Sequence, residues 1–385
     1  MRILVTDGEK HSLGMVRSLG KLGIDVSVIA SKESSLPFYS KYCKHFLVCP
    51  ELDDERKYID FLEKILKTCI YDMIIPVGYR TNQIISKNRE QLSRWVRLEV
   101  VHSEKMEIAL NKKKTYQVAQ NIGIPYPETV YPESFQDLID LSTTIRYPIV
   151  IKGLQEAGRN IVAYARNRDE LLQNFSRLCE ENNLTGENLP MLQEYIQGRG
   201  YGFFALYQHG TCKKIFMHRR IREYPVSGGA SACAQSFYDS RLKDYGIRLL
   251  DALEWHGVAM VEFKGNEQTG DYKMLELNPK FWGSLDLAIA AGVDFPHYLH
   301  QMALGEDLVY SEEYYKNLRF HWPFNGDIQH VIKNIRSILP FLYDLFNPDT
   351  RNNVELADIK PNLRELYLLL VALVPKRLIN VYSRF

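Results

Sequence analysis

The chain has 385 residues, of which 45% are hydrophobic and 25% charged, and these values are typical of globular proteins rather than disordered or collagen-like ones. At about 150 residues per domain, the length predicts two to three domains. The 48 basic and 47 acidic residues leave a net charge of +1, and because nucleic-acid binders usually carry a basic excess, no nucleic-acid partner is expected.

Cysteines and apolar runs indicate the cellular compartment of the protein and whether it spans a membrane. The six cysteines form no Cys-x-x-Cys pair, and the chain starts with a strand pattern instead of a signal peptide, so we expect a cytoplasmic protein. The longest apolar run, Leu366 to Val374, is far shorter than the about 20 residues of a membrane span. We therefore expect no transmembrane span. The run is more typical of a buried helix, and a peripheral membrane contact is the alternative.

The first hundred residues alternate between strand and helix patterns. Arg2–Thr6, Asp25–Ala30 and Met73–Val77 have the short apolar runs of buried strands, and Ser12–Leu22 and Tyr58–Leu66 have helical spacing. This alternation predicts a parallel, doubly wound, Rossmann-like sheet. Ligands of such sheets bind at the carboxyl ends of the strands.

From His102 onward the pattern becomes α+β. A helix over Lys105–Ile122 is expected to end at the following Gly-Ile-Pro, and two further helices are predicted at Arg168–Cys179 and Ser240–Trp255. Strands are predicted at Tyr147–Gly153, Pro190–Ile196, Phe203–Tyr207, Cys212–Arg219, Val258–Lys264 and Tyr272–Leu277. From about Ser311 the pattern is mainly helical.

The segment Val258–Trp282 predicts a hairpin that carries a metal site. Glu276 and Asn278 are two residues apart on the second strand, so they point to the same face, and Glu262 on the first strand can face them. Two carboxylates and an amide make an oxygen-rich site suited to Mg²⁺. Without a cation, such like charges repel. The alternative is a solvated strand face with scattered acids.

Two lysines add side chains suited to phosphoryl transfer. Lys112 starts a helix. Lys152 ends an apolar strand, where a charged side chain is unusual and requires an explanation. Separated lysines together with Mg²⁺ suit a reaction that depends on positioning and charge neutralisation. A solvated helix end and a strand-end lysine are the simpler explanations for each lysine alone. No Walker-type phosphate loop occurs in the sequence.

Taken in order, these segments resemble the ATP-grasp superfamily, in its carbamoyl-phosphate-synthetase-like, carboxylate–amine ligase branch. The resemblance runs from about Met1 to Leu304. Its strongest parts are NKKKTYQVAQNIGIPYPET, YPIVIKG, LQEYIQG and MLELNPKFWGS.

This resemblance implies an α/β and α+β architecture in four parts. These are a Rossmann-like pre-ATP-grasp domain over residues 1–104, ATP-grasp subdomains over 105–192 and 193–308, and a helical C-terminal extension over 309–385. The C-terminal helices, expected at Gln329–Leu345 and Leu363–Leu378, lie outside the resemblance. They could cover the site, form a homodimer contact or touch a membrane.

The resemblance also implies roles for particular residues. Lys112 and Lys152 match the lysines that contact ATP phosphates. The hinge segment that contacts adenine is matched by Gln193, Glu194, Tyr195 and Ile196. The ligands of Mg²⁺, or of Mn²⁺, are matched by Glu262, Glu276 and Asn278. Lys280 matches a position, usually arginine, next to the transferred phosphate.

The implied activity is ATP-dependent ligation of a small-molecule carboxylate to an amine or a related nucleophile. ATP activates the carboxylate as an acyl phosphate, which the nucleophile then displaces, and ADP and phosphate are released. Three departures from the family pattern stand out. No acid follows the hinge in Gly198–Tyr201, the loop Glu156–Asn160 has a single glycine, and Lys280 lacks the bidentate fork of arginine.

Arginines that precede a glycine pair suggest where the substrate binds. Arg220 and Arg222 would share a face of a strand, and arginine binds carboxylate or phosphate through two parallel hydrogen bonds. We expect them to hold the substrate carboxylate or the γ-phosphate. A basic strand edge that discourages aggregation is the alternative.

Two other classes of protein compete with a ligase. The missing ribose acid and Lys280 would also fit a catalytically inactive nucleotide-binding module or assembly partner. A nicotinamide-dependent oxidoreductase is disfavoured, because the loop after the first strand lacks G-x-G-x-x-G and the second strand ends in Ser31-Lys32 instead of an acid.

Overall fold

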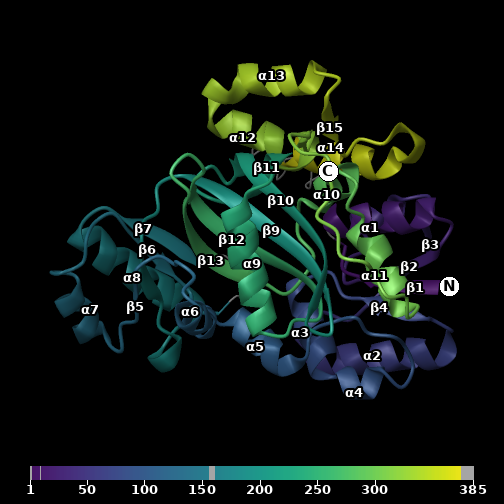
Figure 1. Cartoon of the computed structure of the whole chain (residues 1–385), viewed down its shortest axis with the longest axis horizontal. Coiled ribbons are helices and arrows are strands. Elements are labelled where there is room, and N and C mark those ends of the chain that lie inside the picture. Colours follow the sequence, from purple (N-terminus) through teal and green to yellow (C-terminus); the bar gives the residue numbers. More distant parts are fainter. Residues whose placement is uncertain (1, 9, 156–160, 374–385) are drawn as a thin grey trace, which may run out of the picture. The chain divides into compact units, whose positions relative to one another are not determined.

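The computed structural model describes residues 2–8, 10–155 and 161–373 (Figure 1). It divides into two compact units. The first comprises Met1–Val100, Lys213–Tyr238 and Lys280–Phe385, and the second comprises Val101–Cys212 and Asp239–Pro279. The predicted loop Glu156–Asn160 lies outside the described residues.

The first unit contains a four-stranded parallel sheet in the order β3-β2-β1-β4. Its strands are β1 (Arg2–Thr6), β2 (Asp25–Ala30), β3 (Cys43–Val48) and β4 (Met73–Ile75). The helices that alternate with them are α1 (Lys10–Lys21), α2 (Glu55–Thr68), α3 (Tyr79–Lys87) and α4 (Arg89–Leu92). The apolar residues of β1, β2 and β4 are buried, whereas Phe46 and Val48 of the edge strand β3 are exposed. The predicted Rossmann-like arrangement is confirmed.

The same unit holds four more strands, arranged in the order β10-β11-β14-β15. These strands are β10 (Thr211–Tyr224), β11 (Ala230–Ser236), β14 (Arg319–His321) and β15 (Thr350–Asn352). β11 pairs antiparallel with β10 and β14, and β15 pairs parallel with β14. The C-terminal region is therefore not purely helical, because β14 and β15 extend a sheet that begins with residues more than eighty positions earlier.

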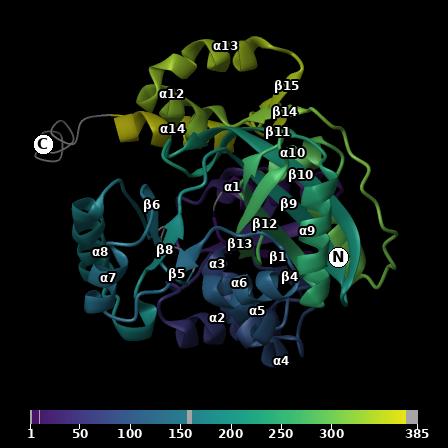
Figure 2. The same ribbon diagram turned by 60° about the vertical axis from the view of Figure 1, so that its left-hand side comes forward.

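Five helices follow residue 280 in the part of the first unit that the structure describes. They are α10 (Leu285–Ala290), α11 (Phe295–Ala303), α12 (Ile328–Lys333), α13 (Ile338–Phe346) and α14 (Lys360–Leu373). Figure 2 shows α12, α13 and α14 together with β14 and β15. Short helical turns occur at η1 (Leu36–Tyr39), η3 (Pro323–Asp327), η4 (Ile335–Ser337) and η5 (Leu356–Asp358). No helix of the described residues is both long and apolar enough to cross a bilayer.

The second unit contains a four-stranded antiparallel sheet in the order β5-β8-β6-β7. Its strands are β5 (Thr129–Val130), β6 (Ile149–Lys152), β7 (Val162–Ala165) and β8 (Met191–Glu194). The helices in this part are α5 (Ser103–Leu110), α6 (Lys112–Asn121), α7 (Phe135–Leu141) and α8 (Arg168–Asn182), with a short turn η2 (Gly186–Asn188). Leu138 of α7 and Leu171 and Phe175 of α8 form a buried core with the sheet.

Three long antiparallel strands complete the second unit, in the order β13-β12-β9. They are β9 (Arg199–Gln208), β12 (Gly257–Asn266) and β13 (Asp271–Asn278), and α9 (Ser240–Ala252) packs against them. A Cβ at Gly246 of α9 would collide with the ring of Phe203, so the glycine allows the helix to approach β9 closely. The predicted β12–β13 hairpin is present.

Candidate active site

The β12–β13 hairpin brings the predicted metal ligands together. Glu262 on β12 lies directly opposite Glu276 on β13. Asn278, two residues beyond Glu276, donates a hydrogen bond from Nδ2 to Glu276 Oε1 at 2.8 Å. Like charges on directly opposite positions destabilise a strand pair. The arrangement is therefore one that a bound cation would stabilise.

Helix α6 places Lys112 beside these carboxylates. The side chain of Asn111 caps the helix by accepting a hydrogen bond from Lys114 N, which fixes the first turn. Lys112 is buried, its backbone N–H donates to Leu154 O, and its Nζ lies 3.4 Å from Glu276 Oε2. The positive charge of Lys112 thus offsets part of the repulsion between the two glutamates.

Lys152 reaches the same place from the end of β6. Its Nζ donates to Gln193 Oε1 at 2.8 Å. Burial lowers the pKa of Lys152 and Lys112 lowers it further, whereas Glu276 and Glu262 raise it. These mutual effects show that both lysines and both glutamates share one electrostatic environment. A second cation this close to Lys112 is costly unless an anion binds there.

A buried network holds Gln193 in place. Gln193 Nε2 donates to the hydroxyl of Tyr116 at 2.9 Å and to Thr129 Oγ1 at 3.1 Å. The Tyr116 hydroxyl in turn donates to the backbone oxygen of Leu275 at 2.6 Å. Tyr116 and Thr129 were not among the site residues expected from the sequence. The available signal was the spacing of Tyr116, four residues after Lys112 and therefore on the same face of α6.

The other predicted hinge residues extend from β8. Glu194 accepts from Lys273 Nζ at 2.5 Å and from the backbone N–H of Glu128 at 3.1 Å, so its side chain ties β8 to its neighbours. Tyr195 is 40% exposed, packs edge-on against Tyr164, and has Lys264 Nζ 5.3 Å from its ring centre. Ile196 follows and is half-buried.

The first unit contains the predicted arginines, and one expectation about them is wrong. Ile221 is an extra residue in β10, so Arg220 pairs with Ala234 of β11 and Arg222 pairs with Cys233. Adjacent strand residues point to opposite faces, so this bulge separates the side chains of Arg220 and Arg222 instead of placing them together.

Arg222 is buried within an acidic cluster. Its Nε and one terminal nitrogen donate to the two oxygens of Asp327 at 2.6 and 2.8 Å, and its other terminal nitrogen donates to Asp344 at 2.7 Å. Burial disfavours ionisation of Asp327, but the hydrogen bonds from Arg222 and His321 hold its pKa below the usual range. Because its nitrogens are committed to these aspartates, the geometry makes Arg222 a positioning residue instead of the expected substrate contact. Nη1 of Arg220 lies 4.0 Å from Oε1 of Glu223.

Lys280 lies near the start of α1 in the first unit. Burial lowers the pKa of His11, and the charges of Lys280 and Lys10 lower it further, so the three side chains share one cationic neighbourhood. Lys280 Nζ also lies 3.5 Å from the backbone oxygen of Phe281, and Lys10 Nζ lies 4.9 Å from the ring centre of Trp322. No sequence pattern singled out Lys10 and His11. They begin α1, directly after the loop that follows the first strand, and ligands of such sheets bind at this edge.

The described residues contain no group of three or more His, Cys, Asp or Glu side chains suited to a metal ion. The candidate Mg²⁺ site therefore consists of two carboxylates and one amide. Carbonyl and carboxylate oxygens are the ligands that Mg²⁺ prefers, and Mg²⁺ usually retains waters and binds substrate phosphates as well. Glu262, Glu276 and Asn278 fit this requirement.

Comparison with known families adds an independent line of evidence. Residues 187–323, which include β8, the hairpin and Lys280, match the family described as "ATP-grasp in the biosynthetic pathway with Ter operon". Among curated proteins, the chain is 20% identical to the D-aspartate ligase of Enterococcus faecium over 67% of this chain and 69% of that protein. It is 24% identical to the carbamoyl phosphate synthase large chain of Methanothermobacter thermautotrophicus over 56% of this chain, and that match spans only 21% of the relative.

Solved structures share the fold at low identity. The biotin carboxylase of Campylobacter jejuni superposes with a TM-score of 0.67 at 17% identity, covering 83% of this chain and 74% of that one. The L-amino acid ligase of Bacillus licheniformis gives a TM-score of 0.64 at 17% identity, covering 80% and 75%. These structures share their fold with the chain, and the family match of residues 187–323 is to an ATP-grasp family.

Proposed function

We propose that this protein is an ATP-dependent ligase that joins a small-molecule carboxylate to an amine through an acyl phosphate, with release of ADP and phosphate. The observation that carries the proposal is the hairpin site, where Glu262 faces Glu276 and Lys112 lies 3.4 Å from Glu276. The similarity to a D-aspartate ligase and an L-amino acid ligase supports an amino acid as one of the two substrates.

The reaction has two balanced steps. An oxygen of the substrate carboxylate attacks the γ-phosphorus of ATP, the bond from that phosphorus to the bridging oxygen breaks, and ADP leaves. The amine nitrogen then attacks the acyl carbon, the carbon–oxygen bond to phosphate breaks, and the nitrogen loses a proton as the C–N bond forms. Phosphorylation thus converts a poor leaving oxygen into a good one.

Each candidate site residue of the second unit has a proposed part in this reaction. Lys112 and Lys152 bind and orient the phosphates of ATP, and Gln193 fixes the ammonium of Lys152 by accepting its hydrogen bond. The partly exposed ring of Tyr195, with Glu194 and Ile196 beside it in the chain, provides the hinge surface for the adenine. Glu262, Glu276 and Asn278 hold Mg²⁺, which when bound neutralises negative charge on the phosphates.

In the first unit, the proposed substrate contacts are cationic. Lys280 and Arg220 bind the carboxylate or the transferred phosphate, and Lys10 adds positive charge near Lys280. Arg222 acts indirectly, because its bonds to Asp327 and Asp344 hold β10 and the segments that carry these aspartates together.

An isotope experiment tests the proposal. The carboxylate substrate is labelled with oxygen-18, and the purified protein is incubated with ATP, Mg²⁺ and pairs of amino acids while ADP release is followed. We expect substrate-dependent ADP release and one labelled oxygen in the phosphate product. Glu276→Gln should abolish both, whereas Asp271→Asn, an exposed carboxylate on the same hairpin, should retain both. Phosphate without label would contradict the acyl-phosphate step.

A nucleotide-binding protein without ligase activity is the second candidate. The segment after the hinge, Gly198–Tyr201, lacks an acid, and lysine replaces arginine at position 280. Tight binding of Mg·ATP, measured by calorimetry, together with no ADP release across the whole panel of acids and amines would favour this candidate.

A further inference from the structure

Helix α13 has an inverted pattern of polar and apolar faces. Its buried side carries Asp344, which accepts hydrogen bonds from Arg222 at 2.7 Å and from Arg319 at 3.0 Å. The opposite side exposes Leu339 (74%), Tyr343 (62%) and Phe346 (78%), which are spaced four and three residues apart and share one face. Ordinary surface helices of globular proteins bury the apolar side and expose the polar one.

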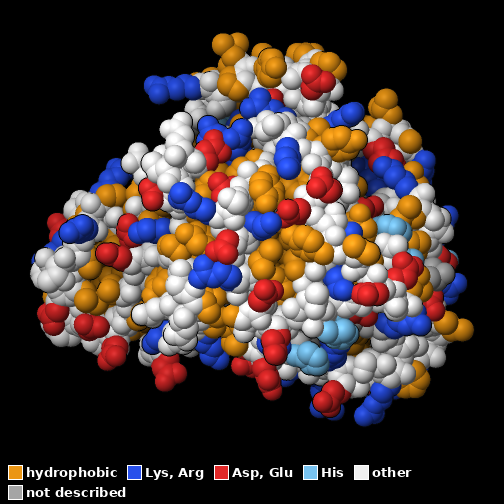
Figure 3. All heavy atoms as spheres, in the orientation of Figure 1, with side chains coloured by type: hydrophobic (Ala, Val, Ile, Leu, Met, Phe, Trp, Pro, Cys, Tyr) orange, Lys and Arg blue, Asp and Glu red, His pale blue; other side chains and the backbone are white. Residues whose placement is uncertain are grey.

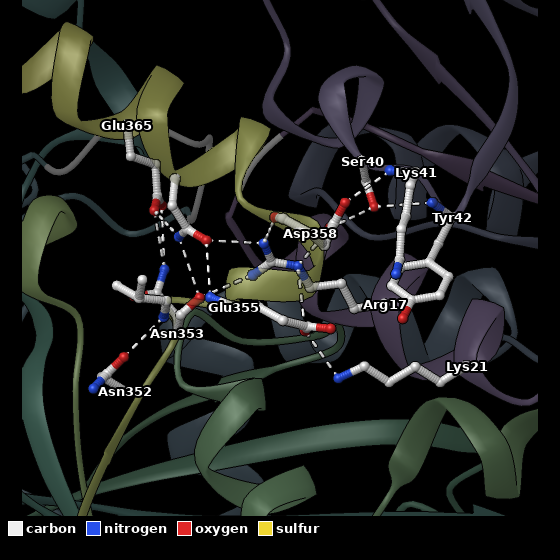
Figure 4. Close-up of polar contacts among 12 residues, drawn as sticks. Arg17, Lys21, Ser40, Lys41, Tyr42, Asn352, Asn353, Glu355, Asp358 and Glu365 are labelled. Atoms are coloured by element: carbon white, nitrogen blue, oxygen red, sulfur yellow. Dashed lines mark hydrogen bonds and ion pairs between the residues drawn. The ribbon is translucent and has the colours of Figure 1, made fainter.

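Helix α14 repeats this inversion. Asn362 and Glu365 on its buried side hydrogen-bond to each other at 2.9 Å, and both contact Asn353. Figure 4 shows Glu365 beside Asn353. The exposed side carries Leu363 (56%) and Tyr367 (54%), one helical turn apart. The inversion is thus a property of the C-terminal region and not of one helix.

Buried polar bonds hold these helices in their orientation. Arg17 of α1 donates to the side chain of Asp358 at 2.9 Å, to its backbone oxygen at 2.7 Å, and to Asn362 Oδ1 at 2.9 Å (Figure 4). Turning α13 to bury its apolar face would take Asp344 away from Arg222. Turning α14 would take Asn362 away from Arg17. Breaking a buried ion pair is strongly destabilising, so the apolar faces stay outside.

The α13 face, defined as Leu339, Leu342, Tyr343 and Phe346, is a gathered apolar surface. Figure 3 shows hydrophobic side chains collected over α13 at the top of the view. Exposed apolar patches of this kind mark sites that contact a protein or a membrane. The charges around the face decide between these two.

Exposed charges near the α13 face are mainly positive. Lys333 and Arg336 are exposed just before the helix, and Arg351 is exposed on β15, which packs against α13. The acids of the region are largely used inside the protein, since Asp327, Asp344, Asp358 and Glu365 are all buried. Of the rest, Asp349 is exposed, and the partly exposed Glu355 pairs with Lys21 at 2.9 Å.

We propose that the α13 face docks on the surface of an anionic phospholipid bilayer. A helix with exposed Leu, Tyr and Phe and neighbouring Lys and Arg has the composition of an interfacial membrane helix, in which apolar burial and attraction to anionic lipids act together. A symmetric contact with a second copy fits less well, because a two-fold interface brings the same surface, with its excess of cations, against itself. The proposal does not depend on the ligase activity.

A vesicle flotation experiment with the full chain tests this docking. The protein is mixed with vesicles of phosphatidylcholine, with or without phosphatidylglycerol, and the floated fraction is measured at low and high salt. We expect binding to the anionic vesicles that weakens with salt, and much weaker binding to phosphatidylcholine alone. Binding that is equal on both vesicle types, or absent from both, would overturn the proposal.

Matched variants separate the contributions of the apolar and the charged side chains to vesicle binding. Leu339→Asn combined with Phe346→Ser should reduce partitioning by about tenfold or more. Lys333→Glu combined with Arg336→Glu should reduce binding to anionic vesicles only. Ile70→Asn, an 82% exposed apolar residue of the same unit far from α13 in the sequence, should bind as the wild type does.

Two controls keep the result interpretable. Thermal unfolding and ADP release should be unchanged in all these variants, because the substituted side chains are exposed. Light scattering should report the same oligomeric state for the wild type and the Leu339→Asn, Phe346→Ser variant. If the wild type instead forms a dimer that this double variant converts to monomer, and no vesicles are bound, the occupant of the face is a second copy and the lipid proposal fails.

Discussion

The facing glutamates of the hairpin predict that the stability change caused by substituting one of them reverses its sign when a cation binds. Glu262 is directly opposite Glu276, and side chains in that relation have Cβ atoms about 5 Å apart. Such like charges cost about 0.2–1 kcal/mol, and Lys112 at 3.4 Å offsets part of this for Glu276. We therefore expect Glu262→Gln to raise the free energy of unfolding of the nucleotide-free protein by about 0.5 kcal/mol. The Tm should rise by about 1–2 °C.

With ligand, the order of stability should invert. Mg²⁺ with a non-hydrolysable ATP analogue at about 100 times its Kd adds about 2.7 kcal/mol to the wild type. Glu262→Gln removes one of the two carboxylates and should gain less. Differential scanning fluorimetry with and without ligand measures both effects, and Asp271→Asn on the same hairpin serves as the control. If Glu262→Gln lowers the Tm without ligand, or keeps the full ligand shift, the metal assignment is refuted.

Four further predictions concern single side chains. Burial lowers the pKa of Lys152, so between that value and the usual one the unfolded chain binds more protons and wild-type stability rises with pH. Lys152→Met should remove this rise in urea unfolding and weaken nucleotide binding about ten- to a hundredfold. Arg222→Met should cost about 3–5 kcal/mol of stability in urea unfolding, because it leaves buried carboxylates unpaired. Arg220→Met should lower kcat/KM but cost less stability than Arg222→Met, because the ion pair of Arg220 with Glu223, at 4.0 Å, is longer than those of Arg222 with Asp327 and Asp344. Equal stability losses in the two variants would contradict their different roles. Burial raises the pKa of Glu365, so wild-type stability rises as the pH falls from that value toward the unfolded one, and Glu365→Gln should abolish this slope.

Much of the candidate site was predictable because its signals are local. The alternation along a strand places Glu276 and Asn278 on one face, and the turn residues at 265–271 imply that β12 returns antiparallel as β13. Lys112 was found as the first residue of a helix, and the parallel sheet was found from alternating strands and helices. Each of these inferences needs only neighbouring residues. The network of Tyr116, Gln193 and Thr129 was missed because its members come from α6, β8 and β5, and no local spacing joins all three.

By itself, the sequence determined the kinds of element and the residues that face each other within a hairpin, since strand period and turn chemistry operate over a few residues. Only the tertiary structure decided the role of Arg222. One extra residue at Ile221 shifts the register of β10 and sends the guanidinium inward to Asp327 and Asp344, over a hundred residues away in the chain. The same ion pairs orient α13 with its carboxylate inside and its apolar side chains outside. A hydrophobic pattern alone predicts the opposite orientation, because it contains no information about the buried arginines that pair with a helix's acids.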